Sequence, residues 1–318
     1  MSAIVRSSKI RTTKVLTNFS LLESKLKNPQ SIPQSLTSSL IHSLTPRLQL
    51  QFLVIMSSKR ILPQFTPITN ANIYEAVDMW CYSRDNAIDE FGHISNWDTS
   101  SVTSMKELFI GQSDFNDDIG KWNVSKVTNF SGMFNEAITF NANLEKWDVS
   151  SATSMAGMFS DAEEFDQPLG DWDVSKVKFF NYMFSGAAAF NQRIGDWDMS
   201  SAVTTACMFY KAVEFNQKLA GWDVSKVTDM SCMFYKAAAF NQHIDKWDVL
   251  ACTNMGGMFH KAIAFSQDIS EWDVSNVTNF RHMFERASSF NQKMLDAWDV
   301  SGVTSMSNML SVHKPRMQ

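Results

Sequence analysis

The sequence predicts an α/β solenoid in which about nine repeats of 25 residues stack behind a helical N-terminal cap. Tryptophan recurs at this period through two-thirds of the chain, and phenylalanine and methionine recur with it. A fixed period of roughly 20 to 50 residues is typical of proteins in which each repeat is one unit stacked on the next. Eight tryptophans keep the period and the ninth comes one residue late: Trp97, Trp122, Trp147, Trp172, Trp197, Trp222, Trp247, Trp272 and Trp298.

The N-terminal cap is expected over residues 61–96. Apolar residues within 73–80 have the i, i+3, i+4, i+7 spacing of one helix face. Asn70 or Asn72 can cap the start of this helix, and Gly92 fits a helix end. An atypical helical unit before an array is expected because the first repeat needs its open end covered.

Each repeat is expected to contain a short strand and a short helix. Residues 230–237 show the same helical spacing of apolar residues, which predicts a two-turn amphipathic helix with Thr228 as its N-cap. Trp222 and Val224 alternate with Asp223, which predicts a short parallel strand. The repeats are expected to occupy residues 97–310, followed by a tail at 311–318.

Two phenylalanine columns and one methionine column are expected to form the core. A methionine row can also indicate metal binding or adaptable recognition, but its place between other apolar positions favours the core. The columns are Phe115, Phe140, Phe165, Phe190, Phe215, Phe240, Phe265 and Phe290; Phe109, Phe134, Phe159, Phe184, Phe209, Phe234, Phe259 and Phe284; and Met133, Met158, Met183, Met208, Met233, Met258, Met283 and Met309.

Charge divides the chain into two parts. Residues 1–60 hold nine Lys or Arg and one acidic residue, a balance of +8, and residues 61–318 hold 19 basic and 32 acidic residues, a balance of −13. The acidic repeats argue against nucleic acid as a partner. The basic, Ser/Thr-rich leader at 1–60 is expected to lack a fixed fold. It suits an organellar transit peptide, or else translation starts at Met56 and the protein is cytoplasmic.

The four cysteines do not predict a disulfide framework. Cys207 and Cys232 occupy the same position of neighbouring repeats and should lie close together. Free buried thiols are expected, with a disulfide between these two as the alternative. The sequence has no apolar run of about 18 residues, so no transmembrane segment is predicted.

The repeat resembles that of a known family. The block Trp-Asp-Val-Ser-x-Val-Thr-x-Met-x-x-Met-Phe-x-x-Ala, followed by Phe-Asn-Gln, covers 97–310 and resembles the 25-residue repeat of mycoplasma surface lipoproteins and BspA-like leucine-rich-repeat surface proteins. Residues 67–97 resemble the N-terminal cap on such repeats in algal and other protist proteins. The resemblance implies a leucine-rich-repeat-like solenoid and a role in surface adhesion or interaction. No cysteine precedes Cys81, so a mycoplasma-style lipid anchor is not expected.

Two polar columns have two interpretations each. The acidic column either accepts hydrogen bonds from nearby turn groups or forms an open acidic ribbon for cations or a basic partner. The asparagine column is expected to form a hydrogen-bonded ladder along the stack. The columns are Asp98, Asn123, Asp148, Asp173, Asp198, Asp223, Asp248, Asp273 and Asp299; and Asn116, Asn141, Asn191, Asn216, Asn241 and Asn291.

The sequence predicts a scaffold rather than an enzyme. It contains no phosphate-binding loop, His-Glu-x-x-His pair or Gly-x-Ser-x-Gly elbow. Its six histidines fall in different columns, so no catalytic, cofactor-binding or metal-binding residues and no cofactor are expected. The leading hypothesis is a non-enzymatic scaffold that binds a protein, or a glycan or cell surface. The alternative is a purely structural array, including one that self-associates end to end through the last repeat.

Overall fold

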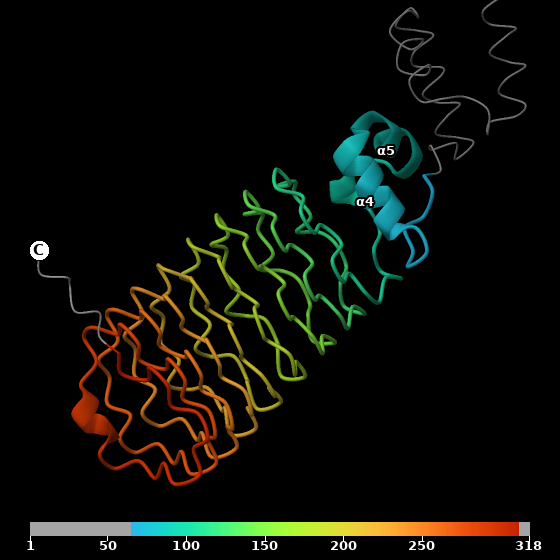
Figure 1. Ribbon diagram of the computed structural model, residues 1–318. Coiled ribbons are helices and arrows are strands. Elements are labelled where there is room, and N and C mark those ends of the chain that lie inside the picture. The colour runs from blue at the N-terminus through green and yellow to red at the C-terminus, as the bar shows by residue number, and fades with distance from the viewer. Residues whose placement is uncertain (1–64, 312–318) are drawn as a thin grey trace, which may run out of the picture. The chain divides into compact units, whose positions relative to one another are not determined.

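The computed structural model of the protein describes residues 65–311 (Figure 1). The predicted leader and the last seven residues, 312–318, lie outside the described residues. The described part contains two α-helices, α4 (Ile73–Tyr82) and α5 (Arg84–Phe91), and two 3-10 helices, η2 (Ile94–Asn96) and η3 (Gln292–Leu295). None of the helices within 65–311 is long and apolar enough to cross a membrane.

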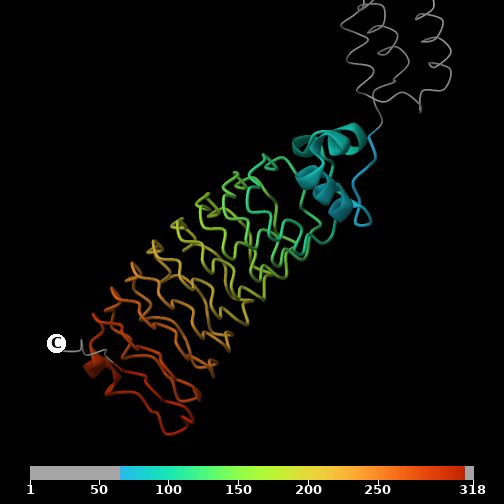
Figure 2. The same ribbon diagram turned by 45° about the horizontal axis from the view of Figure 1, so that its top comes forward.

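Consecutive repeats lie on one another as successive turns of the chain, which both ribbon views show between α5 and η3 (Figures 1 and 2). Parallel bridges join equivalent residues of neighbouring repeats. Their partners are 25 residues apart, the period of the tryptophans, except for the last pair, where the extra residue before Trp298 is accommodated at η3. The bridges are Ser104–Asn129, Asn129–Ser154, Ser154–Phe179, Phe179–Thr204, Thr204–Asp229, Asp229–Asn254, Asn254–Asn279 and Asn279–Ser305.

The predicted helix at 230–237 is wrong, and so are its equivalents in the other repeats. The segment forms consecutive turns, and no α-helix follows α5 within the described residues. Its apolar pattern was nevertheless interpreted correctly, because Met230, Met233, Phe234 and Ala237 are all fully buried. The spacing therefore identified the inward-facing residues but not the backbone conformation.

Backbone geometry explains why turns replace the helix. Cys232 and Lys236 have positive φ angles of 54° and 58°, which an α-helix cannot contain. The N–H groups of Cys232, Phe234 and Lys236 each donate to a carbonyl of the next repeat, at 2.7–2.9 Å. An isolated helix of eight residues is marginal, so these bonds between repeats replace its internal ones. Thr228 likewise bonds back to Val203 and caps no helix.

The predicted strand at the tryptophan is also wrong. Trp222 and Val224 are buried and Asp223 is exposed, as the alternation predicts, but the segment forms no strand. The Trp222 N–H donates to Leu219 at 3.1 Å within the same repeat, so it is not available for a ladder. The parallel bridge forms at Asp229 instead.

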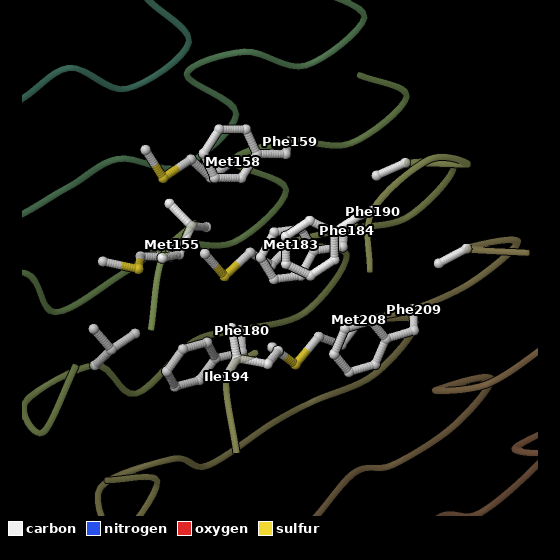
Figure 3. Packing of buried hydrophobic residues seen from close by; sticks show 14 of the residues in the cluster. Met155, Met158, Phe159, Phe180, Met183, Phe184, Phe190, Ile194, Met208 and Phe209 are labelled. Atoms are coloured by element: carbon white, nitrogen blue, oxygen red, sulfur yellow. The ribbon is translucent and has the colours of Figure 1, made fainter. Parts of the chain in front are cut away.

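The core consists of columns of identical side chains. Figure 3 shows Met158, Met183 and Met208 one above another beside a phenylalanine column. Ring centroids of successive phenylalanines in this column, for example Phe159 and Phe184, lie 5.7 Å apart. A second column contacts it, with Phe184 and Phe190 only 3.9 Å apart. Both predicted phenylalanine columns and the methionine column are buried, which confirms their assignment to the core.

Each tryptophan ring connects two repeats through a hydrogen bond. The Nε1–H of Trp222 donates at 2.9 Å to the carbonyl of Ile194, which lies 28 residues earlier in the preceding repeat. The donor and the acceptor are both buried, so the bond satisfies two polar groups that cannot bond to water. The same bond joins Trp122 to Ile94, Trp147 to Ile119, Trp172 to Leu144, Trp197 to Leu169, Trp247 to Leu219, Trp272 to Ile244 and Trp298 to Ile269.

The predicted asparagine ladder is confirmed from Asn116 to Ser266, with a backbone group as the donor, whereas Asn291 Oδ1 accepts from the Lys293 N–H of its own repeat instead. The Asn141 N–H donates at 2.8 Å to Asn116 Oδ1 of the preceding repeat. Glutamine amides add a second bond in several repeats, as from Gln217 Nε2 to Asn191 Oδ1 at 3.0 Å. The main bond recurs from Asp166 to Asn141, Asn191 to Asp166, Asn216 to Asn191, Asn241 to Asn216 and Ser266 to Asn241.

Helix α4 buries the face that its sequence predicts, namely Ile73, Ala76, Val77 and Trp80. Asn72 stands at its N-cap position but makes no capping bond, because its Oδ1 accepts from the Thr69 N–H at 2.7 Å. The expected capping bond is therefore wrong. Gly92 ends α5 with a φ of 78°, as expected for a glycine at a helix end.

The segment around α4 makes polar contacts with the first repeat. Asn70 Oδ1 accepts from the Thr103 N–H at 2.9 Å. In the next repeat, the equivalent Thr128 N–H donates to the carbonyl of Thr103. Asn70 thus supplies the acceptor that a preceding repeat would otherwise provide. Tyr74 and Trp80 add hydrogen bonds to the Lys106 carbonyl and to Asp117, both at 2.8 Å.

The last repeat exposes side chains that the others bury. Val300 is 39% exposed, whereas the equivalent Val274 is 2% exposed. Met306 is 42% exposed, whereas the equivalent Phe280 is fully buried. These positions are normally covered by the following repeat, so they mark an apolar surface on the last one.

We expect Trp222→Ala to lower the free energy of unfolding by about 3–5 kcal/mol, because it removes a buried ring and its bond to Ile194. Trp222→Phe should lose less, since the ring volume is largely kept while the Ile194 carbonyl loses its donor. Glu214→Ala, on an exposed side chain, is the control and should change stability by less than about 0.5 kcal/mol. Urea denaturation measures all three, and parental stability of the alanine variant would contradict the role of this ring.

Candidate functional site

A surface runs along the stack beside the bridged backbone. We call it the ladder face and define it as four columns of side chains that begin at Ser104, Lys106, Glu107 and Ile110 and recur with the repeat. Side chains between these columns, such as Phe109, are buried. The ladder face is thus the outer side of the same turns whose inner side forms the core.

Residue types on the ladder face change from repeat to repeat, unlike those of the core. In the middle and the C-terminal half of the stack, consecutive repeats carry Tyr, Cys, His and Glu at these positions. A row of unlike side chains on a constant frame can be matched to one ligand without altering the core. The columns that carry these residues are Glu107, Gly132, Gly157, Tyr182, Cys207, Cys232, Gly257, His282 and Asn308; and Ile110, Asn135, Ser160, Ser185, Tyr210, Tyr235, His260, Glu285 and Ser311.

Aromatic side chains lie on this face in four consecutive repeats, and we call them the aromatic row: Phe179, Tyr182, Tyr210, Tyr235 and His260. Phe179 and Tyr182 are 44% and 48% exposed. Tyr210 stacks on Tyr235 with ring centroids 4.6 Å apart, and Tyr235 stacks on His260 at 4.3 Å. Exposed aromatic rings of this kind are common where a protein binds another molecule.

Cys207 and Cys232 lie close together, as their shared column predicts, and both are free thiols, with Cys207 buried as expected and Cys232 only half-buried. A hydrogen bond between the two side chains lowers the pKa of Cys207 and raises the pKa of Cys232, while burial opposes ionisation of both. A hydrogen bond to Cys207 also raises the pKa of Tyr182 to about 12. The predicted free state of these thiols is the one the structure shows.

An open pocket of about 530 Å³ interrupts the ladder face. It is lined by Gly256 and Gly257, which leave one repeat without side chains at two adjacent positions. Cys232 and Tyr235 of the repeat before also line it. Arg281, His282 and Glu285 of the repeat after and His260 of the glycine repeat itself complete this part of the lining.

Three side chains of this pocket bring metal-ligating atoms together. One ligand atom from each of His260, His282 and Glu285 lies within 4.8 Å of the others. Glu285 Oε2 is 2.5 Å from His282 Nδ1 and 3.6 Å from His260 Nδ1. His260 is only 8% exposed, and its Nδ1 is buried without a hydrogen-bond partner.

Burial and neighbouring groups shift the pKa values of two members of the cluster, His260 and Glu285. Burial lowers the pKa of His260, although Glu285 opposes this effect. The pKa of Glu285 is lowered because the hydrogen bond from His282 and the nearby charges outweigh its burial. Arg281 Nε donates to His282 Nε2 at 3.1 Å, which leaves the Nδ1 proton of His282 to bond with Glu285.

The sequence pattern within a single column does not group these three residues, because the cluster crosses two columns. His260 and Glu285 are 25 residues apart in one column, and His282 lies three residues before Glu285. The 25-residue register between repeats brings His260 next to Glu285, and the three-residue spacing within a turn brings His282 next to Glu285. The two spacings together predict the cluster.

The side chains of the acidic column accept hydrogen bonds from nearby turn groups, which is one of the two interpretations of this column. Asp223 Oδ1 accepts from the Ser225 N–H at 3.0 Å, and Asn123 accepts from Ser125 in the same way. Hydrogen bonds from the following serine lower the pKa values of Asp98, Asp173 and Asp223. The same backbone bond is made by Asp148, Asp173, Asp198, Asp248, Asp273 and Asp299, and the aspartates of this column are all exposed.

Taken together, the tandem repeats and their shared register define a repeat protein. Residues 78–188, 152–227 and 205–317 each match the sequence profile of a family described as Mycoplasma protein of unknown function, DUF285. The three overlapping matches span well over half of the chain, which therefore belongs to this family. No curated protein matches the sequence.

Substitutions of Asp223 should separate its hydrogen bond from its charge. Asp223→Ala should destabilise the fold by about 1 kcal/mol because the Ser225 N–H loses its acceptor. Asp223→Asn should cost less than half as much, since Asn123 makes the same bond in its own repeat. Thermal melts at neutral pH measure both, and equal losses for the two variants would contradict this role.

The pH dependence follows from the lowered pKa of Asp223. A carboxyl group whose pKa is lower in the folded state contributes stability above its unfolded pKa, and that contribution disappears as pH falls through the folded value. Asp223→Asn should therefore lose less stability than the parent as pH falls below about 4.

Proposed function

We propose that this chain is a non-enzymatic repeat scaffold that binds a protein partner through the ladder face. The observation that carries the proposal is the contrast between a core of repeated residues and a ladder face whose residues differ between repeats. Binding specificity needs unlike side chains at fixed places, and the stack provides a rigid frame for them. The proposed fold is a solenoid of the BspA-like leucine-rich-repeat type, with its predicted short helices replaced by turns.

A protein suits the aromatic row better than a glycan does. Tyr235 stacks on Tyr210 on one side and on His260 on the other, so both of its ring faces, and one ring face of Tyr210, are already covered. A sugar would need open ring faces for stacking. The ring edges and hydroxyl groups that remain, together with exposed Phe179 and Tyr182, suit the apolar and hydrogen-bonding groups of a protein surface.

Lysines beside the tyrosines add positive charge to this surface. Lys211 Nζ lies 5.2 Å from the ring centroid of Tyr210, and Lys236 Nζ lies 5.6 Å from that of Tyr235. The repeats as a whole are acidic, so these cations make the aromatic row locally different from its surroundings. We therefore propose a partner that presents apolar side chains bordered by carboxylates.

The proposal is tested by capture of partners on the immobilised full chain from native lysate. A double variant, Phe179→Ala with Tyr182→Ala, should lose at least about tenfold of a partner captured by the parent, since exposed aromatics often dominate binding energy. The control is Ile138→Ala with Ile263→Ala, which removes two exposed apolar side chains outside the ladder face. Equal capture by parent, variant and control would contradict a role for the ladder face.

End-to-end self-association is the alternative, and the exposed Val300 and Met306 favour it. We expect concentration-dependent dimers in sedimentation experiments, and Val300→Lys with Met306→Lys should abolish them by placing charge on the apolar surface. Val203→Lys, at an exposed valine elsewhere, should leave them unchanged. A monomer at all concentrations would reject this alternative and leave the scaffold proposal standing.

A further inference from the structure

We propose that His260, His282 and Glu285 form a binding site for a divalent transition-metal ion of the zinc class. Two imidazole nitrogens and one carboxylate are a donor set that suits zinc and its neighbours, and calcium and magnesium prefer sites made of oxygen alone. The ligand atoms are His260 Nδ1, His282 Nδ1 and Glu285 Oε2. This site does not depend on the partner proposed for the ladder face.

The unpartnered nitrogen of His260 is the strongest observation in favour of a metal site. Its Nδ1 is buried and makes no hydrogen bond, which normally costs free energy. It lies 3.6 Å from Glu285 Oε2. Two ligands of a tetrahedral zinc ion, each bound at roughly 2.0–2.1 Å, lie about 3.3–3.4 Å apart. A metal ion between these two atoms would therefore satisfy the orphaned nitrogen with little movement.

His282 must adjust slightly more. Its Nδ1 is hydrogen-bonded to Glu285 Oε2 at 2.5 Å, and a metal ion shared by both atoms needs them about 0.8–0.9 Å further apart. The His282 side chain is 32% exposed, so its ring can move toward the pocket. The metal then takes the place of the proton on Nδ1, and the neutral imidazole carries its proton on Nε2.

Arg281 opposes the metal and so provides a specific test. Its Nε now donates to His282 Nε2, and it cannot do so once that nitrogen carries a proton. Its positive charge also repels a cation. Arg281 is exposed, so its side chain can turn into solvent when the metal binds. Removal of this side chain should therefore strengthen metal binding, whereas removal of a ligand should weaken it.

The pocket leaves the remaining coordination positions accessible. Three protein ligands leave at least one position of a tetrahedral ion for water or an external donor. Gly256 and Gly257 contribute no side chains there, and Cys232 also lines the pocket. A bound metal would thus face the open space of the ladder face and could accept a donor atom from a partner.

Calorimetric titration of the full chain with Zn²⁺ tests the site. We expect one ion per chain, and a rise in melting temperature with Zn²⁺ because the metal binds the folded state. His282→Ala and Glu285→Gln should each weaken binding by at least about tenfold. His243→Ala, at an exposed histidine in another column, is the matched control and should bind like the parent. Melting of each variant without metal verifies that it is folded.

The Arg281→Ala variant distinguishes this site from adventitious binding. We expect it to bind Zn²⁺ several-fold more tightly than the parent. In addition, Co²⁺ should give the visible absorption of a low-coordinate ion with the parent and not with Glu285→Gln. Absence of Zn²⁺ binding, or binding that is unchanged in folded His282→Ala, Glu285→Gln and Arg281→Ala variants, would overturn the proposal. Neither result would affect partner capture through Phe179 and Tyr182.

Discussion

The stack depends on backbone N–H groups of one repeat donating to carbonyl groups of the next. In the turn segment they alternate, so that one N–H donates to the following repeat and the next donates three residues back within its own turn. Cys232, Phe234 and Lys236 belong to the first set, and Met233 and Tyr235 belong to the second. Every N–H of residues 230–237 has a partner without a helix or a continuous strand. The turn segments therefore keep one register from repeat to repeat, whereas an extra residue is tolerated elsewhere in a repeat, as at η3.

This alternation also explains why residue types can vary on the ladder face. The column that contains Cys232 has positive φ in every described repeat, whether the residue is Gly, Glu, Tyr, Cys, His or Asn. Such a conformation costs a non-glycine residue about 1–2 kcal/mol. The bonds between repeats hold it in place, so side-chain type is not fixed by backbone preference. Glycine appears at Gly257 where it opens the pocket, and larger residues appear where the face is filled.

The sequence predicted the period, the buried columns and the asparagine ladder because these depend on side chains recurring at equal spacing. It did not predict the backbone of the turns. Met230, Met233, Phe234 and Ala237 have the spacing of a helix face, and a chain of turns buries the same four residues. The difference lies in where the N–H groups donate, and the acceptors are in another repeat. The cluster at Glu285 was missed for a related reason, since it needs the register between repeats as well as the spacing within one.

Although the repeats share one backbone, the side chains that could bind a ligand are not distributed evenly among them. The core is built from residues that recur in every repeat, whereas the ladder face combines unlike residues of neighbouring repeats. There, two glycines meet a histidine of their own repeat and an Arg-His-Glu set of the next, and this combination occurs at one place in the described stack. A single substitution in a repeat can change the environment of its neighbours, because ladder-face side chains such as Tyr235 lie against side chains of the repeats before and after, here Tyr210 and His260. Local function can therefore arise in such an array by few changes, while the core and the backbone ladder remain as they are.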